Sequence, residues 1–276
     1  MTVIEKFSRN LELDDRGVWA AKKQSGISYP DEGNALIFPA EDKLFWFQHR
    51  NKCITTLVQS ITPDGEVFDI GGGNGVVSKA LIDTGIETVL VEPGKEGVKN
   101  ARGRGIPTII HATLGDAEFR PGSLPAVGLF DVLEHIEDDR GMLDEIGRLL
   151  QEGGKLYISV PAYNWLWSHE DDYAGHFRRY TLKGLRSLLK ETDFTVEYAS
   201  YVFSFLPPLS FLIRSLPYRM KLDKWLRIDR EKAVQMDLGV FGKMVELILK
   251  PEIAAIRWGI PLPMGGSCLV AASKVN

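Results

Sequence analysis

Two acidic residues stand on either side of a glycine turn in the stretch VFDIGGGNGVVSKALIDTGIETVLVEPG, which runs from Val67 to Gly94. Asp69 comes just before the glycines at 71–73, and Glu92 ends the next apolar run. Glycines at such a point allow a tight turn with positive φ and let a ligand approach the backbone. A carboxylate before the turn suits a cationic group, and an acid about 20 residues further on can accept hydrogen bonds from ribose hydroxyls. The pattern therefore predicts a ligand with a ribose and a positive group.

S-adenosylmethionine has both features and carries no phosphate, so we predict it as the cofactor, with S-adenosylhomocysteine as the product. A dinucleotide fingerprint would read GxGxxG. Here the position of the third glycine holds Val76, so that fit is partial. A pyrophosphate on a helix N-terminus also requires no acid before the turn. A nicotinamide-dependent oxidoreductase remains the alternative function.

Short apolar runs alternate with helical patterns around this turn, and they must position the two acids. Strands are expected at 66–70, 87–92, 106–112, 126–134, 155–161, 194–203 and 265–274. Helices are expected at 41–61, 75–85, 95–105, 138–154 and 181–193, the last with Thr181 as its N-cap residue. This alternation predicts a doubly wound α/β fold with a mostly parallel sheet and helices on both faces. Ligands bind such sheets beyond the carboxyl ends of the strands.

Five stretches in this order resemble the motifs of class I S-adenosylmethionine-dependent methyltransferases. They are VFDIGGGNG, LVEPG, GDAEF, FDVLEHIEDD and LLQEGGKLYISVPA. The stretch WLWSHEDDYAGHFRRYT is also similar to a segment of many bacterial members. The resemblance covers about Phe45 to Tyr201 and the last strand. It is strongest to the broad subgroup that includes ubiquinone-biosynthesis-like and sugar-pathway methyltransferases.

The resemblance implies a Rossmann-like sheet of seven strands whose last strand is antiparallel. It also implies an adenine contact at Asp116. The stretch FWFQHRN has aromatic residues that can cover the cofactor, with Arg50 near its carboxylate, or that form a core helix face. The full set of expected cofactor-binding residues is Arg50, Asp69, Gly71, Gly72, Gly73, Glu92, Pro93, Asp116, Ala117, Asp131 and Val132. The expected activity is methyl transfer to a small-molecule acceptor.

Three histidines are candidate catalytic residues. His135 comes at the expected end of the fourth strand, where it can act as a general base, contact the acceptor or organise the loop. His169 and His176 flank the acidic stretch EDDYAG and can line an acceptor pocket or belong to an ordered polar loop. Arg178 and Arg179 can hold an anionic acceptor group or form a solvated pair. No histidine or carboxylate spacing indicates a metal site.

Strand and helix patterns no longer alternate between 204 and 263, where the chain is rich in apolar and basic residues. We expect four parts: an arm and helix covering the cofactor site at 1–62, a core at 63–203, a helical insertion or lid at 204–263, and the last strand at 264–276. A lid packed on the domain is expected to wall an apolar acceptor pocket. Contact with a membrane surface, or a non-catalytic binding module on this fold, are the alternatives.

Composition narrows the classes of partner. The chain has 276 residues, a formal net charge of -4 and two cysteines that form no CxxC pair. These features predict no nucleic-acid partner and no disulfide framework, and they favour a cytoplasmic location. No stretch has the apolar length of a membrane span or the pattern of a signal peptide. The acceptor, the atom that is methylated and the oligomeric state are not predicted.

Overall fold

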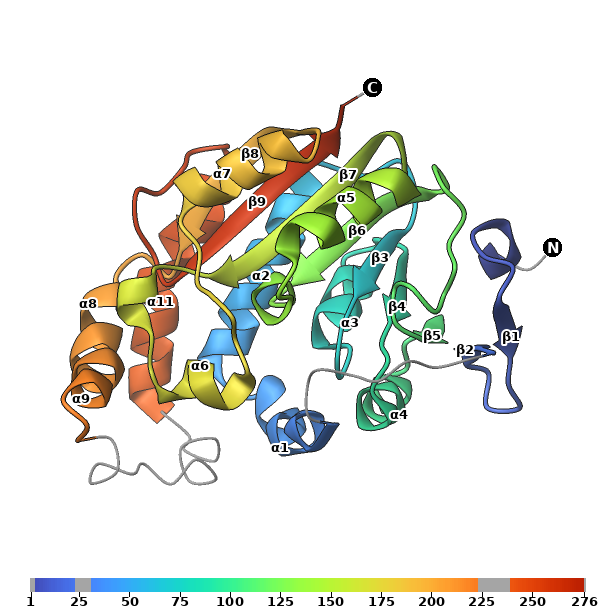
Figure 1. Ribbon diagram of the computed structural model, residues 1–276. Coiled ribbons are helices and arrows are strands. Elements are labelled where there is room, and N and C mark those ends of the chain that lie inside the picture. Colours follow the sequence, from blue (N-terminus) through green and yellow to red (C-terminus); the bar gives the residue numbers. More distant parts are fainter. Residues whose placement is uncertain (1–2, 23–30, 223–238, 276) are drawn as a thin grey trace.

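The computed structural model describes residues 3–22, 31–222 and 239–275 (Figure 1). A central sheet of nine strands spans the described part of the chain, in the order β1-β2-β5-β4-β3-β6-β7-β9-β8. The strands are β1 (Leu11–Leu13), β2 (Trp19–Ala21), β3 (Val67–Ile70), β4 (Thr88–Val91), β5 (Ile109–His111), β6 (Leu124–Phe130), β7 (Leu150–Pro161), β8 (Phe194–Val202) and β9 (Ser267–Lys274).

The strands from β5 to β7 run parallel, and the chain order reverses at β3, which pairs with β4 on one side and β6 on the other. The last strand, β9, is antiparallel to both β7 and β8. This arrangement confirms the predicted doubly wound fold with an antiparallel last strand. The carboxyl ends of β3, β4 and β6 meet at the point of reversal, where open α/β sheets bind their ligands.

Helices cover both faces of the sheet, and each face has its own buried core (Figure 1). On one face α5 (Asp139–Leu149) and α7 (Leu182–Glu191) pack on the strands. On the other face lie α2 (Phe45–Ser60), α3 (Val76–Asp83) and α11 (Gly239–Arg257). The remaining helical elements are η1 (Val3–Lys6), α1 (Asp31–Glu41), α4 (Lys95–Gly103), η2 (Leu133–His135), η3 (Asn164–Leu166), α6 (His169–Ala174), α8 (Leu206–Ser210), η4 (Phe211–Ser215, a π-helical turn) and α9 (Leu216–Arg219).

The strand count differs from the predicted seven. The two additional strands come from the N-terminal arm: β2 pairs parallel with β5, and β1 pairs antiparallel with β2. Each has three residues, and neither has the alternating pattern that would reveal a strand in the sequence. Their pairing covers the edge of β5, which would otherwise expose unpaired backbone groups.

Several predicted boundaries also differ, and two of them lie close to the site. The fourth predicted strand was expected to reach Glu134, but β6 ends at Phe130, because Asp131 has a left-handed φ of 58° that a strand cannot contain. The helix that was expected to end at 154 ends at Leu149 instead, and β7 begins at once. Asp131 to His135 therefore form a loop and a 3-10 turn at the edge of the sheet.

The insertion before β9 divides into two described parts. Its first part, α8 to α9, lies beside α6 and η3, and its last helix, α11, packs on α2 (Figure 1). Phe205 and Leu206 pack against the core on the α2 face. A lid packed on the domain would bury its apolar side chains, but Leu209 and Leu212 are 44% and 59% exposed. Residues 223–238 lie outside the described part.

Candidate active site

A glycine turn joins the carboxyl end of β3 to α3. The N–H of Gly71 donates to the carbonyl of Val91 over 2.7 Å, which fixes the turn to the end of β4. Gly73 has a φ of 54°, in the left-handed region. A Cβ added at Gly72 would lie 2.2 Å from the side chain of Leu90, so no larger residue fits there. The turn therefore keeps its backbone close to whatever occupies the space above it.

Asp69 lies fully buried directly beneath this turn. Its Oδ2 accepts a hydrogen bond of 2.6 Å from the hydroxyl of Ser78, whereas its Oδ1 has no hydrogen-bond partner among the described residues. Burial raises the pKa of Asp69 to about 6, although the Ser78 hydrogen bond and the charge of Arg50 oppose the shift. A buried carboxylate oxygen without a partner costs free energy. A cationic ligand group beside the turn would remove that cost.

Glu92 follows the end of β4 and is also buried. Its two oxygens accept hydrogen bonds from the backbone N–H groups of Gly73 and Gly94, at 2.8 and 2.7 Å. The carboxylate thus ties the glycine turn to the start of α4. Each carboxylate oxygen has two lone pairs, so these bonds leave capacity for ribose hydroxyls. Pro93 accepts a hydrogen bond of 3.1 Å from the ring of His111 through its carbonyl.

Asp116 and Ala117 lie in the loop that follows β5. The hydroxyl of Thr113 donates to Asp116 Oδ2 over 2.7 Å. Ala117 is buried, and its carbonyl accepts a hydrogen bond of 2.6 Å from the hydroxyl of Ser8. The N-terminal arm contacts this loop a second time, because Asn10 donates to the carbonyl of Asp116 over 2.9 Å. The arm thus fixes the segment that the resemblance assigns to adenine.

Asp131 and Arg50 form an ion pair of 2.6 Å at the end of β6. Ser159 donates a further hydrogen bond of 3.0 Å to the Asp131 carboxylate. A left-handed φ at a residue other than glycine costs about 1–3 kcal/mol. The ion pair and the hydrogen bond hold Asp131 in that conformation, and they turn Val132 toward Gly71, where a Cβ would lie 3.1 Å from Val132 Cγ2.

A polar network closes α1 over the glycine turn. Asn34 is buried, and a Cβ added at Gly73 would lie 3.3 Å from its Oδ1. The carbonyl of Asn34 accepts a hydrogen bond of 2.9 Å from Asn74, which also donates to Glu41 over 3.2 Å. Arg104 pairs with Glu41 at 2.9 Å. The sequence analysis missed this network, since nothing in the local pattern around Asn34 links it to the turn.

Two of the three candidate histidines lie together. The rings of His135 and His176 have centroids 4.7 Å apart and meet edge to face. Burial, then the neighbouring His176, lowers the pKa of His135 to about 4, and a hydrogen bond with the backbone of Ala174 opposes the shift. His176 Nδ1 lies 2.9 Å from Asp171 Oδ1. Arg179 binds both oxygens of Asp171, over 2.7 and 2.9 Å.

The third candidate, His169, is not brought into this pair by any described contact. It is exposed and occupies the first position of α6. The residues around it form a capping box in which Ser168 and Asp171 bond reciprocally. The spacing S-x-x-D could have revealed this helix start in the sequence. Asp171, which the sequence analysis did not single out, is the buried centre of the segment.

Glu134 is a second buried acid that sequence reasoning did not select. Its Oε2 has no hydrogen-bond partner among the described residues, and burial together with the charge of Asp131 raises its pKa well above the usual value. Its carbonyl accepts a hydrogen bond of 2.8 Å from the N–H of Phe177. This bond ties the loop after β6 to the segment that carries His176. Its position between Leu133 and His135 in FDVLEHIEDD gave no signal that the carboxylate is buried.

Both arginines after His176 are engaged by acids of the protein. Arg179 pairs with Asp171, as described, and Arg178 pairs with Asp139 at 2.6 Å. Tyr180 also donates to Asp139, over 2.9 Å. The sequence allowed an anion-binding pair or a solvated pair. In the structure both arginines instead form ion pairs with acids of the protein.

An aromatic group joins the loop after β7 to the insertion. Tyr163 stacks on Trp165 and on Tyr201, with centroids 5.5 and 5.0 Å apart. Trp165 also meets Phe211 of η4 edge to face at 5.6 Å. Further contacts with the insertion are those of Tyr218 with Asp172, at 2.7 Å, and of Arg219 with the Trp165 carbonyl, at 3.1 Å.

Comparison with known proteins identifies the class to which this fold and site belong. Residues 45–199, more than half of the chain, match the family described as methyltransferase domain. The chain therefore belongs to the family of S-adenosylmethionine-dependent methyltransferases, which confirms the predicted family and cofactor. This result also removes the nicotinamide-dependent alternative.

Solved structures support the fold. A Haloferax volcanii methyltransferase, solved in complex with the Trm112 methyltransferase activator, is similar with a TM-score of 0.58 and 19% identity over 89% of this chain and 96% of that chain. The Haemonchus contortus phosphoethanolamine N-methyltransferase 2, solved with S-adenosyl-L-methionine, gives a TM-score of 0.53 and 19% identity over 90% of this chain and 58% of that one.

Curated relatives are similar over a shorter stretch. A ubiquinone biosynthesis O-methyltransferase of Xanthomonas oryzae pv. oryzae is 31% identical over 100 residues, which are 34% of this chain. One from Idiomarina loihiensis is 29% identical over 101 residues. The chain spans about two fifths of the length of these relatives, 42% in both cases. Among the described helices, none combines the length and the apolar character that a membrane crossing needs.

Proposed function

We propose that this protein transfers the methyl group of S-adenosylmethionine to a hydroxyl oxygen of a small, largely apolar acceptor. The observation that carries the proposal is the edge-to-face pair of His135, in the turn after β6, and His176, together with the aromatic side chains of Tyr163 and Trp165 in the loop after β7. The ubiquinone biosynthesis O-methyltransferases to which the chain is similar point in the same direction.

The residues around the glycine turn fit the cofactor. The unpartnered Oδ1 of Asp69 is an acceptor suited to a positive group, and the Glu92 carboxylate is suited to ribose hydroxyls. Asp116 would accept from the adenine amino group. The cofactor supplies a methyl group on a sulfonium, which is already an activated leaving group. The protein has then to align the acceptor, exclude water and take up a proton from a hydroxyl acceptor.

We assign the two histidines different roles in removing the proton of the acceptor hydroxyl. A pKa of about 4 keeps His135 neutral at physiological pH, so that it can accept a hydrogen bond but is a weak base. His176 is oriented through Nδ1 by the buried carboxylate of Asp171. A ring held in this way by a carboxylate is a general-base arrangement. We therefore propose that His176 takes up the proton of the acceptor hydroxyl and that His135 positions this hydroxyl.

The acceptor is apolar in this proposal because of the aromatic side chains in the loop after β7, which leads to the segment that carries His176. Tyr163, Trp165 and Phe211 form one aromatic group that joins the loop after β7 to the insertion. The contacts of Tyr218 with Asp172 and of Arg219 with the Trp165 carbonyl support the part of the proposal in which the insertion is a lid over the acceptor. Residues 1–62 are proposed as a cover over the cofactor, supported by the contacts of Asn34 and Asn10 with the turn and the adenine segment. Pockets lined by aromatic side chains with a few polar groups favour hydrophobic ligands.

A panel of acceptors tests this function directly. Purified protein is incubated with methyl-labelled S-adenosylmethionine and one acceptor at a time: a phenol with a long alkyl tail, a short phenol, a free sugar, a lipid-linked sugar and a primary amine. Label is expected on the oxygen of the tailed phenol. Transfer only to the amine or to the free sugar would contradict the proposal. Tight cofactor binding without transfer to any acceptor would favour a non-catalytic binding module.

A further inference from the structure

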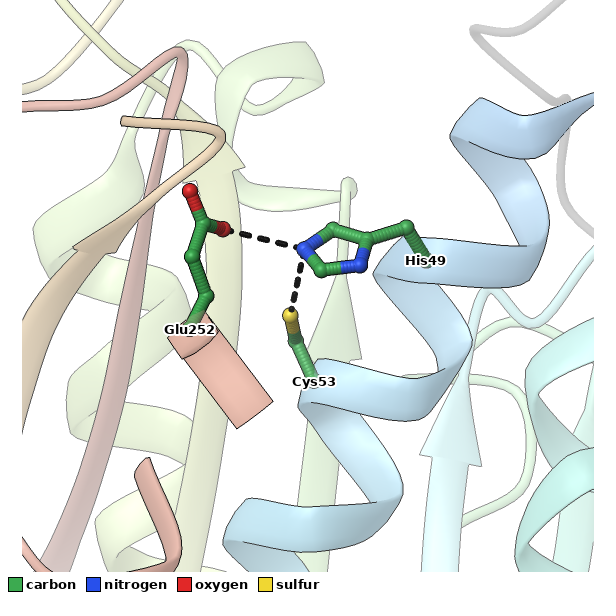
Figure 2. A group of neighbouring side chains, drawn as sticks. All are labelled: His49, Cys53 and Glu252. Atoms are coloured by element: carbon green, nitrogen blue, oxygen red, sulfur yellow. Dashed lines mark hydrogen bonds and ion pairs between the residues drawn. The ribbon is translucent and has the colours of Figure 1, made fainter. Parts of the chain in front are cut away.

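A buried group of potential metal ligands lies between α2 and α11 (Figure 2). It comprises His49 and Cys53 on α2 and Glu252 on α11, and each is at most 3% exposed. His49 Nε2 lies 2.9 Å from Glu252 Oε2 and 3.3 Å from Cys53 Sγ. Figure 2 shows the three side chains pointing toward one another.

The spacing of these atoms is close to that of a tetrahedral coordination shell. Zinc binds imidazole nitrogen at about 2.0–2.1 Å and thiolate sulfur at about 2.3 Å, so neighbouring ligand atoms lie roughly 3.3–3.6 Å apart. All three ligand atoms lie within 4.8 Å of one another. The two measured distances are a few tenths of an ångström shorter than a metal would require. Rotation of the side chains can supply this difference without movement of the helices.

We propose that His49 Nε2, Cys53 Sγ and Glu252 Oε2 form a binding site for a divalent transition-metal ion, with zinc the best match. A set of one thiolate, one imidazole and one carboxylate suits zinc and not magnesium, which prefers oxygen ligands only. The sequence analysis expected no metal site. Its search for close spacings could not include Glu252, which lies 203 residues beyond His49.

The surroundings of Glu252 hold its carboxylate in position for such a role. The N–H groups of Phe203 and Ser204 donate to it over 2.8 and 2.6 Å, and the Ser204 hydroxyl donates over 2.6 Å. Hydrogen bonds from outer residues orient metal-binding carboxylates in this way. These bonds can remain when the metal replaces the contact between Glu252 and His49.

Metal binding at this site requires that protons leave the ligand atoms. The S–H bond of Cys53 breaks as the bond from sulfur to the metal forms, and the proton leaves to solvent. The N–H bond at His49 Nε2, which faces Glu252, breaks as the bond from nitrogen to the metal forms. Solvent takes up this proton and the ring keeps one proton on Nδ1, so that the neutral imidazole is the ligand. No oxidant or reductant is required, because zinc does not change its oxidation state.

A hollow of about 330 Å³ offers the fourth coordination position. It is lined by His49, Lys52, Lys250, Ile253, Ala254 and Arg257. Water from this hollow can complete the tetrahedron, and its basic lining favours hydroxide or another anion in that position. The metal would then connect α2 of the domain to α11 of the insertion, and would stabilise the folded chain in proportion to its occupancy.

Cobalt titration tests the site with a spectroscopic signature. Metal-depleted full-length protein is titrated with Co²⁺ and, separately, with Zn²⁺, while absorption and the thermal midpoint are followed. We expect a sulfur-to-cobalt charge-transfer band that saturates at about one ion per chain, and a higher thermal midpoint with Zn²⁺ but not with Mg²⁺. The band identifies this site, since Glu134, His135 and His176, which also bring ligand atoms together, include no sulfur.

Cys268 provides the matched control, because it is the other free and buried cysteine and lies on β9. Cys53→Ser should abolish the band and the zinc-dependent stabilisation, and Cys268→Ser should retain both. If Cys53→Ser does not fold, His49→Gln replaces it, since glutamine keeps a donor for Glu252. A wild-type protein that gives no band, or a band that survives Cys53→Ser or His49→Gln, would overturn the proposal. The three residues would then be only a hydrogen-bonded link between the helices.

Discussion

The site has a cofactor half around the glycine turn and an acceptor half around His176, and the two are built in different ways. Around the glycine turn, the Glu92 carboxylate is bound by backbone N–H groups, and Asp69 keeps one oxygen without a described partner. Around His176, the polar groups are bound by other side chains, with Asp171 held between His176 and Arg179. In the first half, the glycine turn and its bonds to Glu92 are therefore set by backbone geometry. The second depends on side-chain pairs whose removal leaves a charge unpaired.

The largest effect should follow from breaking the centre of the acceptor half. In Asp171→Ala, Arg179 and His176 lose their buried partner. Removal of one member of a buried ion pair typically costs about 3–5 kcal/mol of stability. Thermal or denaturant unfolding measures the loss. Calorimetry on the protein that remains folded should give an unchanged affinity for S-adenosylmethionine, since Asp171 belongs to the other half. A stability close to that of the wild type would show that the pair is solvated in solution.

The next effect concerns turnover alone. If His176 takes the acceptor proton, His176→Gln should lower the turnover number about 100-fold or more, with cofactor affinity unchanged. His169→Gln is the matched comparison, since His169 belongs to the same segment but is exposed. Steady-state rates on the acceptor found in the panel decide between them. An equal loss in both variants would contradict the assignment of His176 as the base.

A smaller effect is expected at Glu92, in the cofactor half. A charge-assisted hydrogen bond contributes about 1.5–3 kcal/mol, and about 1.4 kcal/mol corresponds to one decade in affinity. Glu92→Ala should therefore weaken cofactor binding at least about tenfold, and the backbone N–H groups of Gly73 and Gly94 should also lose their acceptor. Calorimetric titration with S-adenosylhomocysteine measures this loss. An unchanged affinity, with the fold intact by circular dichroism, would exclude a ribose contact.

The same contrast explains what could be predicted from the sequence. Asp69, the glycines and Glu92 lie at the ends of two neighbouring strands. The position of each is fixed by the strand or turn to which it belongs. Their positions at the sheet edge follow from the order of the strands alone. The acceptor half brings together Glu134, Asp171 and a distant insertion, and their burial depends on long-range packing. Sequence spacing therefore indicated His135 and His176 as candidates but not the acids that surround them.

The two additional strands and the exposed Leu209 and Leu212 are failures of a different kind. Both concern segments whose local pattern is weak, so that tertiary pairing decides the structure. Three-residue strands such as β1 carry too few positions for a periodic signal. An apolar residue need not find a partner, because folded proteins keep much apolar surface exposed.

The smallest expected effect is a dependence on pH. Burial holds the pKa of Asp69 at about 6 in the free protein, above its usual value. Below that pH the carboxyl is protonated and cannot attract a cation. Affinity for S-adenosylmethionine should thus fall as pH decreases, by about tenfold between about pH 7 and about pH 5. The Asp69→Asn variant should bind S-adenosylmethionine weakly at both pH values, with little dependence on pH. A wild-type affinity that is flat over this interval would place the cation elsewhere.

The most direct test of the separation between the two halves is one set of calorimetric titrations with S-adenosylmethionine. Wild-type protein, Asp69→Asn and His176→Gln are compared at neutral pH. We predict that Asp69→Asn weakens the affinity at least about tenfold, since a charged partner is lost, and that His176→Gln leaves it unchanged. Equal affinity in wild type and Asp69→Asn, or an equal loss in both variants, would contradict the assignment of the cofactor to the glycine turn and of the acceptor to the histidines.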